Sequence, residues 1–203
     1  MSQQPEMERR EIERAGVDIG QGIRTKFMER FTTGAEADGK YKMDLATTIS
    51  RIRAASRLIN RIGAERLLVC AGLTKAETPT AMFCEKVGAR RMDGRFWPGT
   101  LTNPSLHYYI EPSLVLVTEP QIDAQAVTEA TNAGIPVIGV SNTNNITSCL
   151  DIVIPANTMG TKAMAAVFWL LARSTIEEGG GDPDAVGPIK GFENKAGDEP
   201  EQD

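Results

Sequence analysis

The chain has 203 residues, 41% of them hydrophobic, which is enough for one core and a domain of roughly 150 to 180 residues with tails. It has no apolar run of about 18 residues and begins with a polar, charged stretch, so we expect a cytosolic protein without a signal peptide or a transmembrane helix. Three widely spaced cysteines, Cys70, Cys84 and Cys149, favour buried free thiols and argue against a disulfide or a zinc site.

The net charge of −5 is unevenly distributed. Residues 174–203 carry nine acids and two lysines, a net charge of −7, whereas residues 20–62 carry nine Lys or Arg and four acids, a net charge of +5. Neither region reaches the strongly basic balance of a free nucleic-acid binder, so an ordinary solvated surface is the alternative to RNA contact.

The first 39 residues have little regular pattern. Residues 6–15 suit a short charged helix, and residues 16–39, which contain five glycines, predict a long irregular segment. Such segments in compact domains are usually functional or ordered by a partner. Arg24, Lys26 and Arg30 are therefore candidate phosphate contacts, with a solvated loop as the alternative.

A regular pattern begins at residue 40. Apolar strands without polar alternation, separated by helical stretches, indicate a parallel sheet covered on both faces, and so a doubly wound α/β domain. The expected strands are 41–44, 66–71, 89–92, 113–118, 136–140 and 151–154. The expected helices are 46–62, 76–87, 121–133 and 160–173, of which the last is apolar around most of its circumference and should pack inside the body. The glycine- and acid-rich residues 179–203 should be disordered.

Ligands bind beyond the carboxyl ends of the strands in open α/β sheets, but the loops there carry no nucleotide motif. The sequence contains neither GxGxxG after a first strand nor GxxxxGK[ST]. His107 is the only histidine, and packing or hydrogen bonding explains it better than general-base catalysis. Glu119 and Asp151, at strand ends, suit capping or local ion pairs. We therefore expect no catalytic site, no metal and no cofactor.

Two loops and one helix start are the best candidates for a binding surface. The run SNTNNITS at 141–148 can satisfy its own backbone or contact phosphate and ribose. The stretch 94–112 combines turn-forming residues with four aromatic side chains, so either the protein or a partner must order it. At 155–162, polar residues precede the last helix and would attract anions or simply cap it. A fourth feature is a series of arginines at positions 53, 57 and 61. They recur every four residues along one edge of the expected helix, which usually indicates a solvated stripe.

Longer stretches resemble a known family closely. They are GRFWPGTLTNP, YIEPSLVLVTEP and the block AVTEATNAGIPVIGVSNTNNITSCLDIVIPANTMGTKAMAAVFWLLAR, preceded by AGVDIG, RTKFM, DGKYKMDL and RIRAASRLI. In this order, over residues 14–176, they resemble the ribosomal protein S2 family of the small subunit, in its archaeal and eukaryotic, laminin-receptor-like branch. The bacterial branch inserts a coiled-coil hairpin after its first helix, and no room for one exists between Ile62 and Arg66.

The resemblance implies a three-layer, flavodoxin-like parallel sheet and a structural role without catalysis. It also implies contacts with small-subunit ribosomal RNA and neighbouring ribosomal proteins, near the junction of head and body on the solvent side. The expected parts are an N-terminal helix and extension at 1–39, the α/β domain at 40–176 and an acidic tail at 177–203. With the basic segment included, the candidate RNA-binding residues are Arg24, Thr25, Lys26, Arg95, Pro98, Gly99, Thr100, Asn103, Asn144, Thr147, Ser148 and Lys162.

Two other functions stay open at this point. The same fold hosts sugar-phosphate and nucleotide enzymes, which would need a ligand pocket at the strand ends. A protein-interaction module that works away from the ribosome is the other. Neither alternative predicts a membrane partner.

Overall fold

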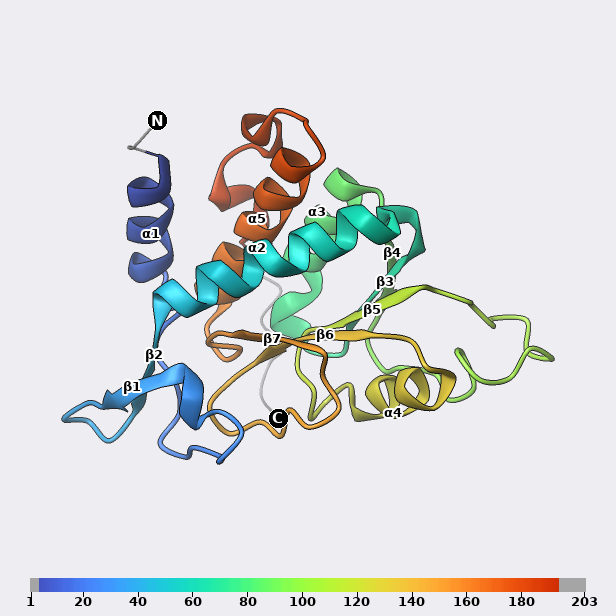
Figure 1. Cartoon of the computed structure of the whole chain (residues 1–203), viewed down its shortest axis with the longest axis horizontal. Coiled ribbons are helices and arrows are strands. Elements are labelled where there is room, and N and C mark those ends of the chain that lie inside the picture. The colour runs from blue at the N-terminus through green and yellow to red at the C-terminus, as the bar shows by residue number, and fades with distance from the viewer. Residues whose placement is uncertain (1–3, 194–203) are drawn as a thin grey trace.

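The computed structural model describes residues 4–193. A five-stranded parallel sheet forms its centre, with the spatial order β4-β3-β5-β6-β7 (Figure 1). The strands are β3 (Leu67–Ala71), β4 (Arg90–Asp93), β5 (Leu114–Val117), β6 (Val137–Ser141) and β7 (Ile152–Pro155). The chain adds β4 on one side of β3 and the other three strands on the opposite side, which is the flavodoxin-like order. The direction of winding reverses between β3 and β5.

Helices cover both faces of this sheet, as expected. They are α1 (Gln4–Arg14), α2 (Leu45–Ile62), α3 (Glu77–Val87), α4 (Ala124–Ala133) and α5 (Thr161–Glu178). Figure 1 shows α2, α3 and α5 on one side of the sheet and α4 on the other. The short helices η2 (Ala64–Arg66) and η3 (Thr74–Ala76) flank β3, and α2 runs into β3 without an inserted hairpin.

The two faces of the sheet bury alternate side chains of the same strands. Leu67 and Val69 of β3 join the core under α2, α3 and α5, whereas Leu68 and Cys70 join the smaller core under α4. Side chains alternate between faces along a strand, and both faces here are covered. This explains why the strands read as continuous apolar runs, with every residue of β3, β5 and β6 buried.

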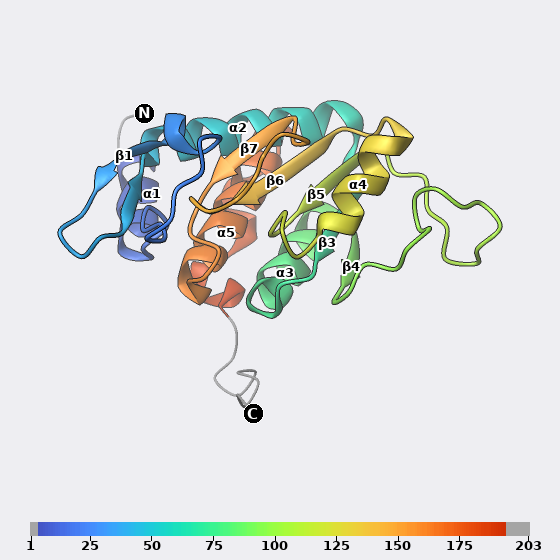
Figure 2. The ribbon, with the colours of Figure 1, turned by 90° about the horizontal axis from the view of Figure 1, so that it is seen from below.

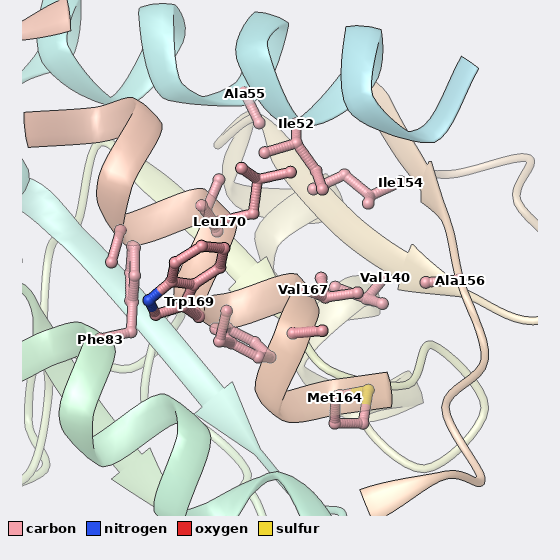
Figure 3. Close-up of a cluster of buried hydrophobic side chains, with 14 of the residues drawn as sticks. Ile52, Ala55, Phe83, Val140, Ile154, Ala156, Met164, Val167, Trp169 and Leu170 are labelled. Atoms are coloured by element: carbon pink, nitrogen blue, oxygen red, sulfur yellow. The ribbon is translucent and has the colours of Figure 1, made fainter. Parts of the chain in front are cut away.

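Helix α5 is the centre of the larger core. Twelve of its 18 residues are buried, because it lies between α2 and α3 and has neighbours around most of its circumference. In Figure 3, Val167 lies next to Val140 of β6, while Leu170 points towards Ile52 of α2. The prediction of a buried closing helix is confirmed, although α5 continues five residues past the expected end.

The N-terminal third holds more regular structure than the sequence indicated. After η1 (Glu29–Phe31), strands β1 (Thr32–Ala35) and β2 (Tyr41–Met43) form an antiparallel hairpin. Its turn contains Asp38 and Gly39, with Gly39 at φ +83°, a conformation that glycine adopts easily. Aspartate followed by glycine is a hairpin signal, and it was missed because β1 (TTGA) has no apolar alternation.

The expected disorder after Gly179 is wrong for residues 179–193. Two short helices, η4 (Pro183–Val186) and η5 (Ile189–Phe192), pack against α5. Val186 and Phe192 are buried, and the Trp169 indole donates a hydrogen bond to the Gly187 carbonyl at 2.9 Å. Val186, Ile189 and Phe192 are three residues apart, which matches the period of a 3₁₀-helix. These apolar side chains suffice to dock a segment whose composition is mostly polar. The rest of the expected tail, 194–203, lies outside the described residues, and the three-part division of the chain stays a prediction.

The three cysteines divide between core and surface. Cys70 and Cys84 are buried free thiols, as predicted, and burial raises the pKa of Cys84 to about 12. Cys149 is exposed, so that part of the prediction is wrong. It lies in the turn just before β7, and it belongs to neither main core.

Candidate RNA interface

The N-terminal segment (residues 16–31) lies across the loops that follow β6 and β7. The Asn157 backbone N–H donates to the Val17 carbonyl at 2.9 Å, and the Asn157 side chain donates to Gly16. The Gln21 backbone N–H donates to the Thr143 hydroxyl at 2.9 Å. These bonds use main-chain groups, so the segment is ordered by the protein itself.

Thr25 joins this segment to the polar loop (residues 141–148). Its backbone N–H donates to the Thr143 carbonyl at 2.9 Å, and its hydroxyl donates to the Asn145 carbonyl at 2.7 Å. The polar loop is in turn fixed by Asn145, whose side chain donates a hydrogen bond to the Glu119 carboxylate and accepts one from the Asn142 N–H. The side chains of Asn142, Thr143 and Asn145 are thus bonded within the protein itself.

Two buried carboxylates stand beside this loop at the point where the winding of the sheet reverses. Asp123 accepts from the Gly72 N–H at 3.1 Å and from the Thr118 hydroxyl at 3.2 Å, which joins the ends of β3 and β5. Burial raises the pKa of Asp123 to about 6. Burial also raises the pKa of Glu119, and the hydrogen bond from Asn145 opposes part of that effect. Both groups connect loops of the fold, which is a structural task.

The aromatic loop (residues 94–112) is anchored on the other side of the sheet. Glu129 of α4 is 4% exposed and accepts the backbone N–H groups of Gly99 at 2.7 Å and Leu101 at 3.1 Å. Burial raises the pKa of this carboxyl, but these bonds and one from the Gln125 amide outweigh burial, and the net pKa is lowered. Phe96 and Leu101 enter the core under α4, so the aromatic loop is also ordered by the protein.

The predicted RNA-binding residues differ in accessibility. The exposed ones are Lys26, Arg95, Pro98, Asn103, Ser148 and Lys162, and the half-buried ones are Arg24, Thr25, Gly99 and Asn144. Thr100 and Thr147 are buried, which leaves their hydroxyls without direct access to a partner molecule. The Arg24 guanidinium is already used, with Glu29 and the Thr32 hydroxyl each at 3.1 Å.

These residues do not form one patch. Thr25 brings the N-terminal segment next to Asn144, Thr147 and Ser148 of the polar loop. The aromatic loop, which carries the group from 95 to 103, lies at the opposite end of the molecule (Figure 2). The sequence placed the aromatic loop and the polar loop after strands, but it could not show that β4 and β6 are separated by β3 and β5.

Helix α2 carries a basic surface, of which only Arg57 belongs to the series of arginines at 53, 57 and 61 that was interpreted as a solvated stripe. It has four arginines and no acid in 18 residues. Arg51 of α2 and Arg30 of η1 both lie against the Phe31 ring, at 5.6 and 4.7 Å from its centre. An open hollow of about 490 Å³ is lined by Arg51 and Arg57 together with hydroxyls and small side chains. We call Arg30, Arg51 and Arg57 the basic face. The sequence did carry a signal for this basic face, namely the net charge of +5 over residues 20–62.

No cluster of three or more potential metal-binding side chains exists within residues 4–193. None of the helices in that range is long and apolar enough to cross a membrane. The strand-end carboxylates accept hydrogen bonds from the protein's own loops. Such an arrangement defines a flavodoxin-like scaffold with a basic, hydroxyl-bearing surface.

Comparison with known proteins identifies the family. A family model described as Ribosomal protein S2 matches residues 107–179. Small ribosomal subunit protein uS2 of Nitrosopumilus maritimus is 54% identical, with 89% of this chain and 88% of that protein covered. The proteins of the same description from Cenarchaeum symbiosum and Staphylothermus marinus are 50% and 42% identical, with 88% and 89% of this chain and 86% and 84% of theirs covered. The chain belongs to the ribosomal protein S2 family.

Family membership confirms the resemblance seen in the sequence, including its archaeal and eukaryotic branch. The chain is a structural protein of the small ribosomal subunit in the cytoplasm, and it is not an enzyme. The sugar-phosphate or nucleotide enzyme on the same fold is thereby set aside.

Proposed function

We propose that this chain binds small-subunit ribosomal RNA through the basic face, and through Lys26 and the exposed residues of the aromatic loop. The observation that carries this proposal is that the guanidinium groups of Arg30 and Arg51 both lie over the Phe31 ring. This shared contact joins the basic N-terminal segment to α2, a helix without acidic residues. Guanidinium groups contact phosphate, and the neighbouring Thr47 and Ser50 hydroxyls suit ribose and phosphate oxygens.

The acidic net charge of the chain does not oppose this role. Charges farther apart than about 10 Å are largely screened at physiological salt. The acids concentrate after residue 174, whereas α2 carries only positive charge. Arg57 does meet Glu178, at 3.8 Å, but both side chains are solvent-exposed, and such pairs contribute little stability. Phosphate can therefore compete for the Arg57 guanidinium.

A second surface suits neighbouring ribosomal proteins. Ile23 and Phe27, on either side of Thr25, are 69% and 45% exposed, and Ile146 follows the Asn145 carbonyl that Thr25 binds. Exposed apolar side chains that gather near one contact favour a protein partner. As the family resemblance implies, we place these contacts near the junction of head and body on the solvent side of the subunit.

The test is the salt dependence of binding to small subunits. Each lost phosphate contact lowers the slope of log affinity against log salt by about 0.7 to 0.9. The double variant Arg51→Ala and Arg57→Ala should reduce that slope by about 1 to 2 and lower occupancy on purified small subunits at high salt. Lys86→Ala with Lys190→Ala removes the same charge from exposed lysines elsewhere and serves as the control. An unchanged slope in the arginine variant would remove the basic face from the contact set.

A further inference from the structure

The aromatic loop carries a pocket that the fold does not need. About 390 Å³ in volume, it is lined by Met92 and Asp93 at the end of β4 and by Trp97, His107, Tyr108, Tyr109 and Ile110. Trp97 is 54% exposed and belongs to neither core, although it stands next to the buried Phe96. The volume falls within the range of about 300 to 1,000 Å³ that is usual for small-ligand sites.

Three of the lining rings hold one another in edge-to-face contacts. Trp97 and Tyr108 meet edge to face at 5.1 Å, and His107 meets Tyr108 in the same way at 4.9 Å. The Tyr108 hydroxyl donates to the Pro98 carbonyl at 3.3 Å, which fixes the ring. Exposed aromatic rings held in this manner take flat, unsaturated groups, of which an unpaired nucleobase is the one that RNA supplies.

The rings are held in place before any partner arrives. The loop around Trp97 is tied to Glu129 through the Gly99 and Leu101 amides, and the side chains of Phe96 and Leu101 lie in the core. Gly99 has φ +90°, and a Cβ at this position would meet Leu106 Cδ1 at 2.6 Å, so the turn closes tightly. A ring fixed in advance loses little conformational entropy on binding.

The positive charge near the pocket favours RNA, which carries phosphates, over a peptide with few acidic residues. Arg95 is exposed and lies in sequence between two lining residues, Asp93 and Trp97. The Asp93 carboxylate is paired with Arg91 at 2.6 Å, which neutralises the acid that would otherwise repel a phosphate. A nucleotide with its base on Trp97 would thus have the Arg95 guanidinium available for its phosphate.

We propose that this pocket holds one unpaired nucleotide of ribosomal RNA, with its base stacked on Trp97 and its phosphate near Arg95. The proposal rests on the proposed function, and it adds a site for a single base to a surface that otherwise contacts phosphate and ribose. An extended segment of a neighbouring protein, seated along the open edge of β4, is the competing occupant.

The test uses intact small subunits that carry the wild-type chain, Trp97→Ala or Trp97→Phe, probed by acylation of flexible ribose hydroxyls. In the Trp97→Ala subunits one unpaired nucleotide should gain reactivity about fivefold or more, the factor that corresponds to about 1 kcal/mol of lost base stacking. Trp97→Phe should restore most of the protection. Ile122→Ala removes another half-exposed apolar side chain, outside the pocket, and should leave the pattern unchanged.

The result separates this proposal from the proposed function. An unchanged reactivity pattern in Trp97→Ala subunits at full occupancy overturns the nucleotide pocket and leaves binding through the basic face intact. Loss of a crosslink to a neighbouring protein, without any change in the RNA, overturns it in favour of the peptide. If the double variant Arg51→Ala and Arg57→Ala kept the wild-type slope of log affinity against log salt, only the proposed RNA contact of the basic face would be contradicted. Because Trp97 is half exposed, the alanine variant should fold, and its thermal midpoint checks this.

Discussion

The N-terminal segment and the aromatic loop are both irregular, and the protein orders them in different ways. The N-terminal segment is held by many separate bonds, in which Val17, Gln21 and Thr25 each contact a strand-end loop. The aromatic loop depends on one buried carboxylate and two apolar side chains. Single substitutions should therefore weaken the aromatic loop more than the N-terminal segment.

The largest expected effect comes from Phe96, a residue of the aromatic loop that is buried in the core under α4. Phe96→Ala leaves a cavity and should lower the free energy of unfolding by about 3 to 4 kcal/mol. Urea unfolding followed by circular dichroism measures this. Trp97→Ala, at the adjacent exposed position, is the control and should cost less than about 1 kcal/mol. Equal losses in the two variants would mean that the loop is not anchored through the core.

The next effect comes from Glu129. Glu129→Leu leaves the Gly99 and Leu101 N–H groups without an acceptor and should lower the free energy of unfolding by about 2 to 3 kcal/mol. Hydrogen exchange at these two amides should accelerate in parallel. Glu129→Gln keeps one accepting oxygen and should lose less, and Glu85→Gln, on the exposed face of α3, should change almost nothing. Continued protection of both amides in the leucine variant would contradict this anchoring role.

A smaller effect is expected for Gly20 in the N-terminal segment. A Cβ at this position would lie 2.7 Å from the Tyr41 carbonyl oxygen and would also meet Thr143. Gly20→Ala should therefore lower the free energy of unfolding by about 1 to 2 kcal/mol. Gly34→Ala is the matched control, because nothing lies within 4 Å of its added methyl group. If Gly20→Ala were as stable as the control, the segment would not be held closely against the polar loop.

The smallest effect is a dependence on pH. The pKa of Glu129 is lowered in the folded state, because the hydrogen bonds outweigh burial. Its contribution to stability should thus be complete above the unfolded value of about 4.3 and should be lost as the pH falls through the folded pKa. The difference in stability between wild type and Glu129→Gln, measured by urea unfolding between neutral pH and about pH 3, should shrink at the acid end. A difference that grows on acidification would show that burial dominates.

The order of strands and helices from residue 40 was predictable from the sequence. The runs around Val69, Leu116 and Ile138 are continuous and apolar because each is buried on both sides, and Gly88 and Gly134 end their helices in the left-handed conformation that glycine favours. The hairpin of β1 and the docked turns near Phe192 were missed. Their local signals, the Asp38-Gly39 turn and the spaced apolar residues Val186 and Phe192, are short, and neighbouring polar residues and glycines outweigh them in composition.

The candidate site was predictable as a set of loops but not as a surface. The sequence marked Lys26 and Arg95, which are exposed, but it also marked Thr100 and Thr147, which are buried. A hydroxyl in a polar run has the same local signal whether it faces a partner or its own backbone. Arg51 was passed over, since nothing in the spacing of α2 reveals that Phe31 lies beneath its guanidinium.

The sequence by itself determined the fold class, the family and the absence of a nucleotide motif, because these depend on hydrophobic periodicity and on residue identity along the chain. The tertiary structure alone decided which polar groups are used internally by the fold and which stay free for a partner. The strand order separates the two ends of the molecule, and the contact between η1 and α2 places the Arg51 guanidinium over the Phe31 ring. Accessibility and proximity of this kind arise when the chain closes on itself, so they are properties of contacts and not of segments.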